Sequence, residues 1–246
     1  MKAAARQRLD QLLVARGLAP SRERARALVI AGQVMVDGAV VAKAGTAVAA
    51  DANVTLAKPD HPYVGRGGVK LAHALDEFRI DVRGREALDI GASTGGFTDV
   101  LLRRGAARVV ALDVGHGQID WRLRNDPRVV VIEGLNARYL QPADIPVPVD
   151  LVTIDVSFIS LTQVLPRVPP VLRPGADIVA LVKPQFEAGR DEVRKGVVRD
   201  PAVHARAVER VTQAAELVGL RACGVTPSPI TGAEGNREFL LHLQNP

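Results

Sequence analysis

From Glu86 to its end, the chain alternates short β-branched runs with helical patterns, and this alternation restricts its fold more than any other feature. Five such runs come first and two more close the chain, in the order EALDI, RVVALDV, RVVVIE, VDLVTIDVSF, ADIVALVK, RACGVT and EFLLHL. Strands that are apolar along their length and separated by helices are typical of a parallel sheet with both faces covered. We therefore expect an α/β domain in which the first five runs form a parallel sheet with helices on both faces.

The composition agrees with such a core and restricts the setting of the protein. Apolar residues make up 47% of the chain and aromatic residues only 3%, so Val, Leu, Ile and Ala must fill the interior. No apolar run approaches the roughly 20 residues that a membrane-spanning helix needs, and the first residues lack the apolar stretch of a secretion signal. Cys223 is the only cysteine, so no internal disulfide can form. A reducing cytoplasmic location is the expectation, with no stable membrane association.

The first part of the chain has a different pattern, in which two helical segments are followed by a hairpin. Ser21 is a good N-cap for the second helix, and Asp37-Gly38 between alternating valines predicts a tight hairpin turn. These signals predict a small α+β domain over residues 1–58. Prolines and glycines then indicate an irregular linker over 59–70, and the α/β domain occupies 71–246.

Positive charge is concentrated near the N-terminus. Residues 1–70 hold 11 Lys or Arg and 5 Asp or Glu, a balance of +6, whereas residues 71–246 hold 21 and 22, a balance of −1. A basic module gains free energy beside a polyanion by releasing counterions, which makes nucleic acid a natural partner. A basic surface that only keeps the protein soluble is the alternative.

The segment LDIGASTGGFTDVLL, residues 88–102, predicts a cofactor site. The first strand ends at Asp89, a turn rich in glycine follows with Gly91 and Gly95, and a helix begins near Phe97. We expect Asp89, Gly91 and Gly95 to bind the cofactor. Glycines let the backbone approach a ligand, and Asp113, at the end of the next strand, can accept hydrogen bonds from an adenosine ribose. The spacing G-x-x-x-G-G lacks the second glycine of the dinucleotide fingerprint. S-adenosylmethionine, which has no phosphate, is therefore favoured over a nicotinamide dinucleotide.

Four charged residues are expected to meet at the edge of the sheet that faces this cofactor. Asp155 and Lys183 end the fourth and fifth strands, Glu238 begins the last one, and Lys70 lies where a helix leaves the linker. The carboxyl ends of parallel strands face the ligand crevice. We hypothesise that Lys183 removes the proton from a ribose 2′-hydroxyl with help from Lys70, while both carboxylates orient the lysines and the hydroxyl. Ordinary salt bridges are the alternative.

Two resemblances add to this interpretation. Residues 7–55 resemble the RNA-binding domain named after ribosomal protein S-four, which implies an RNA surface on the second helix and the hairpin. That surface would include Arg22, Arg24 and Arg26, and Arg66 in the basic linker is a further expected RNA contact.

Nearly the whole chain resembles the TlyA family, and through it the FtsJ-like 2′-O-methyltransferases. The matching blocks are GRGGVKL, LDIGASTGGFTDVLL, IDVSFISL, LVKPQFE and SPITGAEGNREFLL. The resemblance implies a Rossmann-like methyltransferase fold with a mostly parallel seven-stranded sheet whose final hairpin adds an antiparallel strand. It implies methylation of a cytidine 2′-hydroxyl in ribosomal RNA, so the expected partner is ribosomal RNA or a ribosomal subunit. The Lys-Asp-Lys-Glu tetrad of the wider family falls on Lys70, Asp155, Lys183 and Glu238. The cofactor residues of the family fall on Gly91, Ser93, Phe97 and Asp113, with Asp155 close by.

Other functions remain to be weighed against this one. Some family members carry a haemolysin label, which suggests a membrane-active protein, but the helices here lack the apolar face opposed to a basic one that such activity needs. A non-catalytic ribosome assembly factor would bind RNA without using the tetrad, and nothing specifies the hydride site of an oxidoreductase. The five histidines are scattered, so no metal site is expected.

Overall fold

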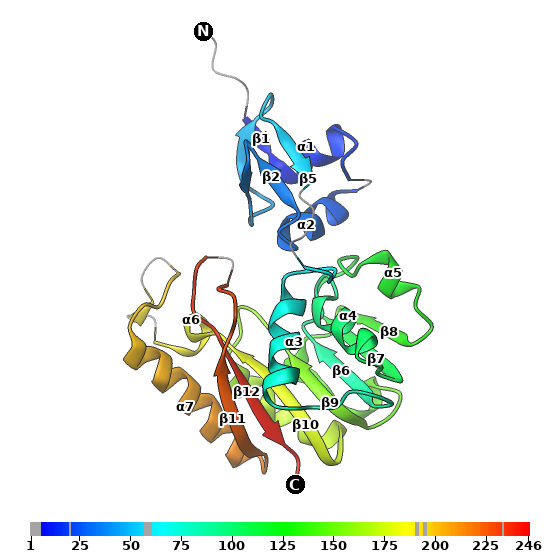
Figure 1. The fold of residues 1–246 in the computed structure, drawn as a ribbon, viewed down its shortest axis with the longest axis vertical. Helices are drawn as coiled ribbons and strands as arrows, with labels where there is room; N and C mark the ends of the chain where they lie inside the picture. Colours follow the sequence, from blue (N-terminus) through cyan, green and yellow to red (C-terminus); the bar gives the residue numbers. More distant parts are fainter. Residues whose placement is uncertain (1–5, 20, 57–60, 190–191, 194–195, 233) are drawn as a thin grey trace.

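The computed structural model describes residues 6–19, 21–56, 61–189, 192–193, 196–232 and 234–246, which form two domains, one above the other in Figure 1. The elements of the N-terminal domain are β1 (Arg6–Arg8), α1 (Leu9–Ala15), α2 (Arg22–Ile30), β2 (Val34–Val36), β3 (Ala39–Val40), β4 (Ala47–Ala49) and β5 (Val54–Leu56). Those of the C-terminal domain are α3 (Gly67–Glu77), β6 (Glu86–Ile90), α4 (Gly96–Arg103), β7 (Arg108–Asp113), α5 (Trp121–Arg124), β8 (Val129–Glu133), β9 (Val149–Ile154), β10 (Leu172–Val182), α6 (Pro184–Glu187), α7 (Pro201–Leu217), β11 (Arg221–Pro227) and β12 (Phe239–Gln244).

The N-terminal domain is the small α+β unit that its sequence predicts. The Ser21 hydroxyl caps α2 by accepting a hydrogen bond from the Arg24 backbone N–H at 3.1 Å. The predicted hairpin joins β2 to β3, and both turn residues, Asp37 and Gly38, have positive φ. Helices α1 and α2 bury their leucines, valines and alanines against these strands. The domain thus has a core of its own.

A second, two-stranded sheet in this domain was not predicted. Strand β1 has the sequence RQR and pairs antiparallel with β4. Its side chains are exposed or half-buried, so it has no apolar alternation by which a strand is recognised. Its pairing with β4 is therefore visible only in three dimensions.

The C-terminal domain contains the predicted seven-stranded sheet, with strand order β11-β12-β10-β9-β6-β7-β8. Strands β10, β9, β6, β7 and β8 run parallel, whereas β12 is antiparallel to both of its neighbours. The mostly parallel sheet and its antiparallel strand are thus confirmed. Along β7, Val109 and Ala111 belong to one core while Val110 and Leu112 belong to the other. Both faces of the sheet are therefore buried.

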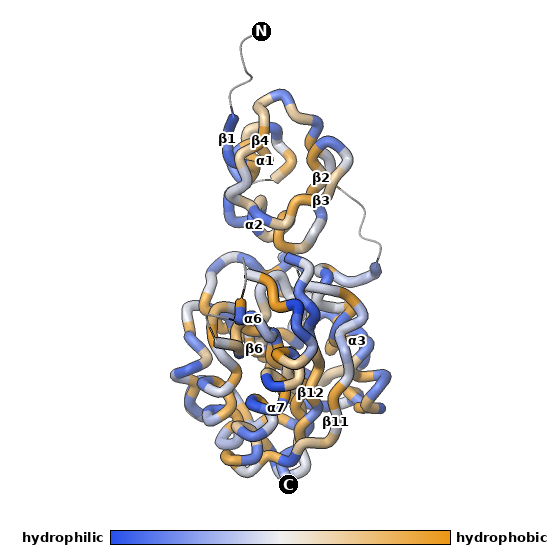
Figure 2. Tube along the Cα trace, turned by 90° about the vertical axis from the view of Figure 1, so that its left-hand side faces the viewer, coloured by the Kyte–Doolittle hydropathy of each residue, from blue (hydrophilic) through white to orange (hydrophobic). Residues whose placement is uncertain are grey.

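The two faces are covered in different ways. Helices α3 and α4 pack on one face, and α7 packs on the other. Between β9 and β10 the second face is covered by three short 3-10 turns, Leu161–Gln163, Leu165–Arg167 and Pro169–Val171. Three prolines in this stretch, Pro166, Pro169 and Pro170, prevent a continuous α-helix because they lack the backbone N–H. Figure 2 shows hydrophobic residues gathered along the strands and hydrophilic residues at the turns.

The expectation of an irregular linker up to residue 70 was wrong at its C-terminal end. Helix α3 begins at Gly67, so the last residues of the predicted linker are helical, while residues 57–60 at the predicted domain boundary lie outside the described residues. The glycines here allow close packing: a Cβ on Gly68 would lie 2.5 Å from the Tyr63 side chain. The glycines predict irregular structure, but the structure shows that glycine is required because a side chain at Gly68 would not fit beside Tyr63.

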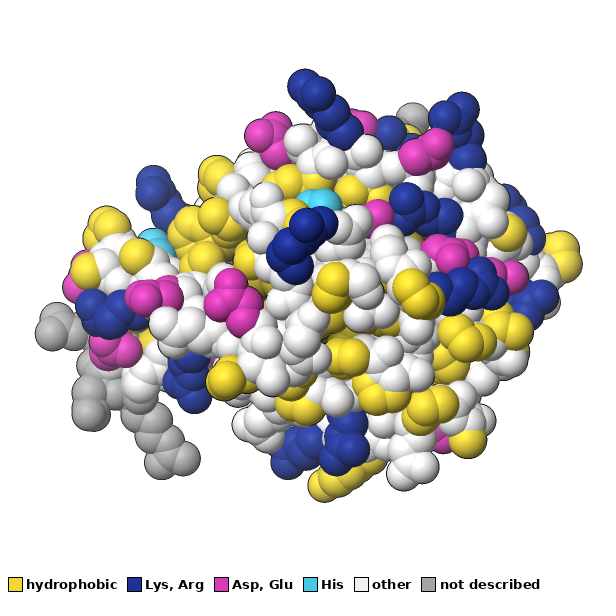
Figure 3. All heavy atoms as spheres, turned by 90° about the horizontal axis from the view of Figure 1, so that it is seen from below, with side chains coloured by type: hydrophobic (Ala, Val, Ile, Leu, Met, Phe, Trp, Pro, Cys, Tyr) yellow, Lys and Arg dark blue, Asp and Glu magenta, His cyan; other side chains and the backbone are white. Residues whose placement is uncertain are grey.

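The domains are joined by polar contacts as well as by the linker. The Arg24 guanidinium lies 3.1 Å from the Asp120 carboxylate, and the Lys43 ammonium lies 2.6 Å from the Glu234 carboxylate. The opposite end of the C-terminal domain, seen from below in Figure 3, shows basic and acidic side chains interspersed without a large patch of one sign. No helix in the described part of the chain has both the length and the apolar character to cross a membrane.

Candidate active site

The glycine-rich turn after β6 lies against the end of β9. Gly91 has a φ of +85°, and a Cβ on it would lie 2.4 Å from the Asp155 carbonyl oxygen. The Asp155 backbone N–H donates to the Ile90 carbonyl oxygen at 2.9 Å, which fixes the two strand ends together. Only glycine fits this conformation and this contact, so the turn places Asp155 directly beside the predicted cofactor loop.

Asp113 at the end of β7 braces the same turn. Its carboxylate accepts hydrogen bonds from the backbone N–H groups of Ser93 and Gly115, both at 2.7 Å. Ser93 has a positive φ of 48°, which this hydrogen bond helps to maintain. The remaining lone pairs of the carboxylate are available to ribose hydroxyls, as expected for an adenosine site.

Asp89 takes a different position from the one that the sequence suggests. It is fully buried beneath α4, where it accepts hydrogen bonds from the Thr98 hydroxyl at 2.7 Å and the Thr153 hydroxyl at 3.0 Å. Burial raises the pKa of this carboxyl group to about 7, despite the two threonines that lower it. The structure therefore does not bring Asp89 to the cavity described below, and it links β6, α4 and β9 instead.

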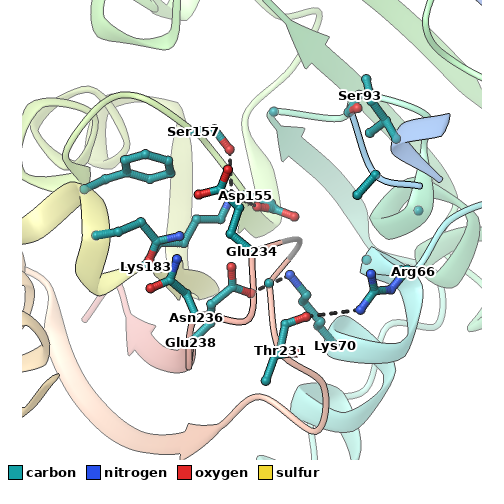
Figure 4. A pocket seen from close by; sticks show the side chains of 18 of the residues that line it. Arg66, Lys70, Ser93, Asp155, Ser157, Lys183, Thr231, Glu234, Asn236 and Glu238 are labelled. Carbon is teal, nitrogen blue, oxygen red and sulfur yellow. Dashed lines mark hydrogen bonds and ion pairs between the residues drawn. The ribbon is translucent and has the colours of Figure 1, made fainter. Parts of the chain in front are cut away.

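The structure brings the four predicted tetrad residues to one edge of the sheet, as two ion pairs. The Lys183 ammonium lies 2.6 Å from the Asp155 carboxylate, and the Lys70 ammonium lies 2.5 Å from that of Glu238. Glu238 precedes the antiparallel strand β12, whose register sets Phe239 opposite Val182, so Glu238 lies beside the carboxyl ends of the parallel strands. Figure 4 shows both pairs facing the same space.

Electrostatics tie the two pairs together. Burial alone would raise the pKa of Asp155, but the positive charges of Lys183 and Lys70 outweigh it and lower that pKa below its usual value. Asp155 is therefore an ionised acceptor near neutral pH. Lys70, Lys183 and Glu238 are each buried, so every one of these charges depends on its partner.

Ser157 is a site residue that sequence reasoning missed. Its hydroxyl accepts a hydrogen bond from the Lys183 ammonium at 2.9 Å, so Lys183 is held by this hydrogen bond and by its ion pair with Asp155 (Figure 4). Ser157 follows Asp155 by two residues, and residues two apart in extended chain point to the same side. That spacing was the available signal.

A cavity of about 510 Å³ joins these groups to the glycine-rich turn. Its walls include the tetrad, Gly91, Ser93 and Phe97 from the cofactor loop, and Phe158 and Phe186. The last two rings lie 5.2 Å apart, and Phe158 is 92% exposed with a φ of +64°. Gly95 and Asp113 are not among the lining residues: Gly95 turns beneath Leu123, and Asp113 lies behind Ser93.

The N-terminal domain forms part of the wall of this cavity. Ile30 and Ala31 at the end of α2, and Ala42 and Lys43 after the hairpin, line it from above. Arg66 lines it from the linker and donates to the Thr231 carbonyl oxygen at 3.2 Å (Figure 4). The cavity thus lies between the two domains, and its volume falls within the usual range for small-molecule sites, roughly 300–1,000 Å³.

The other arginines predicted to meet RNA lie outside the cavity, on two different partners. Arg22 and Arg26 are half exposed and contact the buried Asp10 carboxylate, and hydrogen bonding by Arg8 lowers the pKa of Asp10 to about 2. Arg24 instead pairs with Asp120 across the domain boundary. The structure therefore leaves Arg22 and Arg26 facing solvent, whereas Arg24 is engaged between the domains. The described residues contain no group of three or more His, Cys, Asp or Glu side chains arranged to hold a metal ion.

Comparisons with known proteins agree with this division into two domains. Residues 63–245 match the family model described as FtsJ-like methyltransferase, and residues 7–54 match the S4 domain. The chain is 51% identical to the 16S/23S rRNA (cytidine-2′-O)-methyltransferase TlyA of Mycobacterium tuberculosis, over 98% of this chain and 91% of that protein. It is 40% identical to Hemolysin A of Brachyspira hyodysenteriae, over 96% of this chain and 99% of that protein. A solved structure described as a hemolysin from Streptococcus thermophilus has a TM-score of 0.77 at 43% identity, covering 99% of this chain and 90% of that one.

Proposed function

The chain belongs to the FtsJ-like methyltransferase family, and from this membership we infer that it methylates ribosomal RNA with S-adenosylmethionine as the methyl donor. We propose a cytidine 2′-hydroxyl as the acceptor, because a relative half identical to this chain is named for that reaction. The observation that carries the proposal is the presence of two lysine–carboxylate pairs on one cavity with the glycine-rich turn.

The cavity suits the cofactor in size and in chemistry. Gly91, Ser93 and Phe97 would hold the nucleoside and the amino-acid part, and the Asp113 carboxylate would accept from the ribose hydroxyls. The close approach of Gly91 to the Asp155 carbonyl leaves no room for a side chain at position 91, which lines the cavity. When bound, S-adenosylmethionine supplies an electrophilic methyl group on a sulfonium. Asp155, next to this turn, would lie close to that end of it.

Lys183 is the proposed general base for the ribose hydroxyl. A neutral amine has two N–H bonds and one lone pair in a tetrahedral arrangement. The Ser157 hydroxyl accepts a hydrogen bond from Nζ, and the Asp155 carboxylate lies 2.6 Å from the same atom, so these two groups would face the two N–H bonds. The lone pair is then left for the remaining direction, where the hydroxyl of a substrate in the cavity would donate its proton to Nζ. Ser157 is thus a positioning residue, since it acts through Lys183.

Lys70 and Glu238 would complete the site from the opposite side. The Lys70 charge helps to keep Asp155 ionised, and Glu238 balances that charge within a buried environment. A fixed arrangement of this kind holds the attacking hydroxyl and the methyl group in line, which contributes a large part of the acceleration in transfer reactions. We propose Arg22, Arg26 and Arg66 as RNA contacts, ribosomal RNA or a ribosomal subunit as the partner, and the cytoplasm as the location.

The decisive experiment replaces Lys183 with methionine, which keeps most of the length of the side chain and removes its amine. Purified protein, ribosomal subunits and labelled S-adenosylmethionine would be incubated, and the labelled nucleotide mapped. We expect methyl transfer to fall by roughly 10²- to 10⁴-fold, the usual contribution of a general base, while cofactor affinity stays near that of the unaltered protein. Arg83→Met is the matched control, because this exposed cation is paired with Asp81 and precedes β6. It therefore lies at the amino ends of the parallel strands, away from the tetrad. Undiminished transfer by Lys183→Met would refute the assigned role.

The same assay separates the alternatives. A non-catalytic assembly factor would bind ribosomal subunits without binding S-adenosylmethionine, whereas the Gly91 turn and the tetrad favour binding. A membrane-active protein, as the name Hemolysin A of a relative suggests, would release dye from liposomes without any added factor. Neither alternative accounts for two buried lysine–carboxylate pairs on one cavity.

A further inference from the structure

The only tryptophan of the chain lies on the surface. Trp121 is the first residue of α5 and is 66% exposed, although large aromatic rings are mostly buried in folded proteins. Leu123 of the same short helix is buried, so Trp121 is the one apolar side chain that α5 presents to solvent. The other two exposed residues of this helix, Arg122 and Arg124, are charged.

The charges next to Trp121 are arranged with the arginines outside and the carboxylates inside. Arg122 pairs with Asp120, and Arg124 pairs with Glu133. The side chain of Arg122 is 59% exposed, whereas that of Asp120 is only 6% exposed. A ligand that approaches from solvent therefore meets guanidinium groups, although the formal charges of each pair cancel.

Helix α5 lies next to α2 of the N-terminal domain. Asp120, the N-cap of α5, also binds Arg24 of α2, and Gly117 lies beside Glu23 at the start of α2. Figure 1 shows α5 at the end of the C-terminal domain that is nearest to the N-terminal domain. The exposed arginines of α2 and those of α5 thus lie on neighbouring elements across the domain boundary.

We propose that α5 is a second RNA-contacting element, in which Trp121 stacks on an unpaired base of the substrate and Arg122 and Arg124 meet phosphates. An exposed indole flanked by guanidinium groups matches the way in which single-stranded RNA is bound, through base stacking and backbone charge. A protein partner would need a wider apolar area than one ring on a four-residue helix provides. The inference rests on the proposed function, because it takes ribosomal RNA as the partner.

The test uses the full chain and two readouts. Trp121→Ala should raise the apparent KM for ribosomal subunits in the methyl-transfer assay by about tenfold, since stacking on one base contributes about 1–3 kcal/mol. Trp121→Phe, which keeps an aromatic face, should restore most of the affinity. In addition, protein-free ribosomal RNA should quench the tryptophan emission, which comes entirely from Trp121. S-adenosylmethionine affinity should not change.

Leu217→Ala is the matched control, because Leu217 is also a highly exposed apolar residue but lies at the end of α7. An unchanged KM for Trp121→Ala, or an equal loss in Trp121→Phe, would overturn the proposal, and α5 would then be available for a protein partner. If the unaltered protein methylates no subunit at all, the proposed function fails, and that result differs from either of these.

Discussion

Replacing Ser157 with alanine should slow methyl transfer without weakening the binding of the cofactor. Lys183 Nζ donates a hydrogen bond to the Ser157 hydroxyl at 2.9 Å and forms an ion pair with the Asp155 carboxylate at 2.6 Å. The alanine variant keeps the shorter contact and loses the longer one. Lys183 then remains in place but can turn about the axis that joins it to Asp155.

The expected size of the effect follows from that geometry. A hydrogen bond of this kind contributes about 1–2 kcal/mol, and 1.4 kcal/mol corresponds to about tenfold in rate. We therefore expect a fall of about tenfold in the single-turnover rate of methyl transfer, measured at saturating ribosomal subunits with labelled S-adenosylmethionine. This is far less than the loss expected for Lys183→Met. Ser157→Thr, which retains a hydroxyl, should recover most of the rate.

A double-mutant cycle distinguishes positioning from a merely structural role. If Ser157 acts through Lys183, Ser157→Ala should have little further effect once Lys183 is methionine. An equal loss in both backgrounds, or a loss of cofactor affinity in calorimetric titration, would refute the reasoning. An unchanged rate in the single variant would also refute it.

Two further substitutions test the support of the site. Gly91→Ala should abolish S-adenosylmethionine binding in calorimetry, because its Cβ would lie 2.4 Å from the Asp155 carbonyl oxygen at a φ of +85°; cofactor binding at full affinity contradicts this. Asp89→Asn should change how stability depends on pH. Burial raises the pKa of Asp89 from 3.8 to about 7, so the folded protein binds a proton that the unfolded chain releases. The unaltered protein should therefore lose stability relative to the variant as pH rises from 3.8 to about 7, with a constant difference above that range. Scanning calorimetry at several pH values measures this, and parallel curves for the two proteins would exclude it.

The elements that local pattern could predict are those whose side chains alternate between two cores. The buried positions of β7 and β10 are apolar except for Asp177, and the Asp37-Gly38 pair adopts the positive φ values that a tight turn needs. The positions of Asp155 and Lys183 could be anticipated as well, because a residue that follows a parallel strand must lie at its carboxyl end. Their roles in catalysis stay a prediction until the variants are measured.

Features that depend on a distant partner could not be predicted. The sequence places Gly68 in an irregular linker, because it does not show that Tyr63 occupies the space that a side chain at Gly68 would need. Asp89 is an acidic residue at the end of a strand, where a ligand contact is expected, yet hydrogen bonds from Thr98 and Thr153 hold it beneath α4. Arg24 is a cation on the helix that is expected to contact RNA, and only the folded chain shows that it forms an ion pair with Asp120.

The shared wall of the cavity has a consequence for how such a protein can change over time. Ile30 and Ala42 belong to one domain and the tetrad to the other. RNA recognition and methyl transfer are therefore not carried by structurally independent domains. Substitutions in the N-terminal domain that change which RNA is bound must also preserve the shape of the catalytic cavity. Replacing the N-terminal domain with that of another RNA-binding protein would therefore remove one wall of the catalytic cavity together with the original RNA specificity.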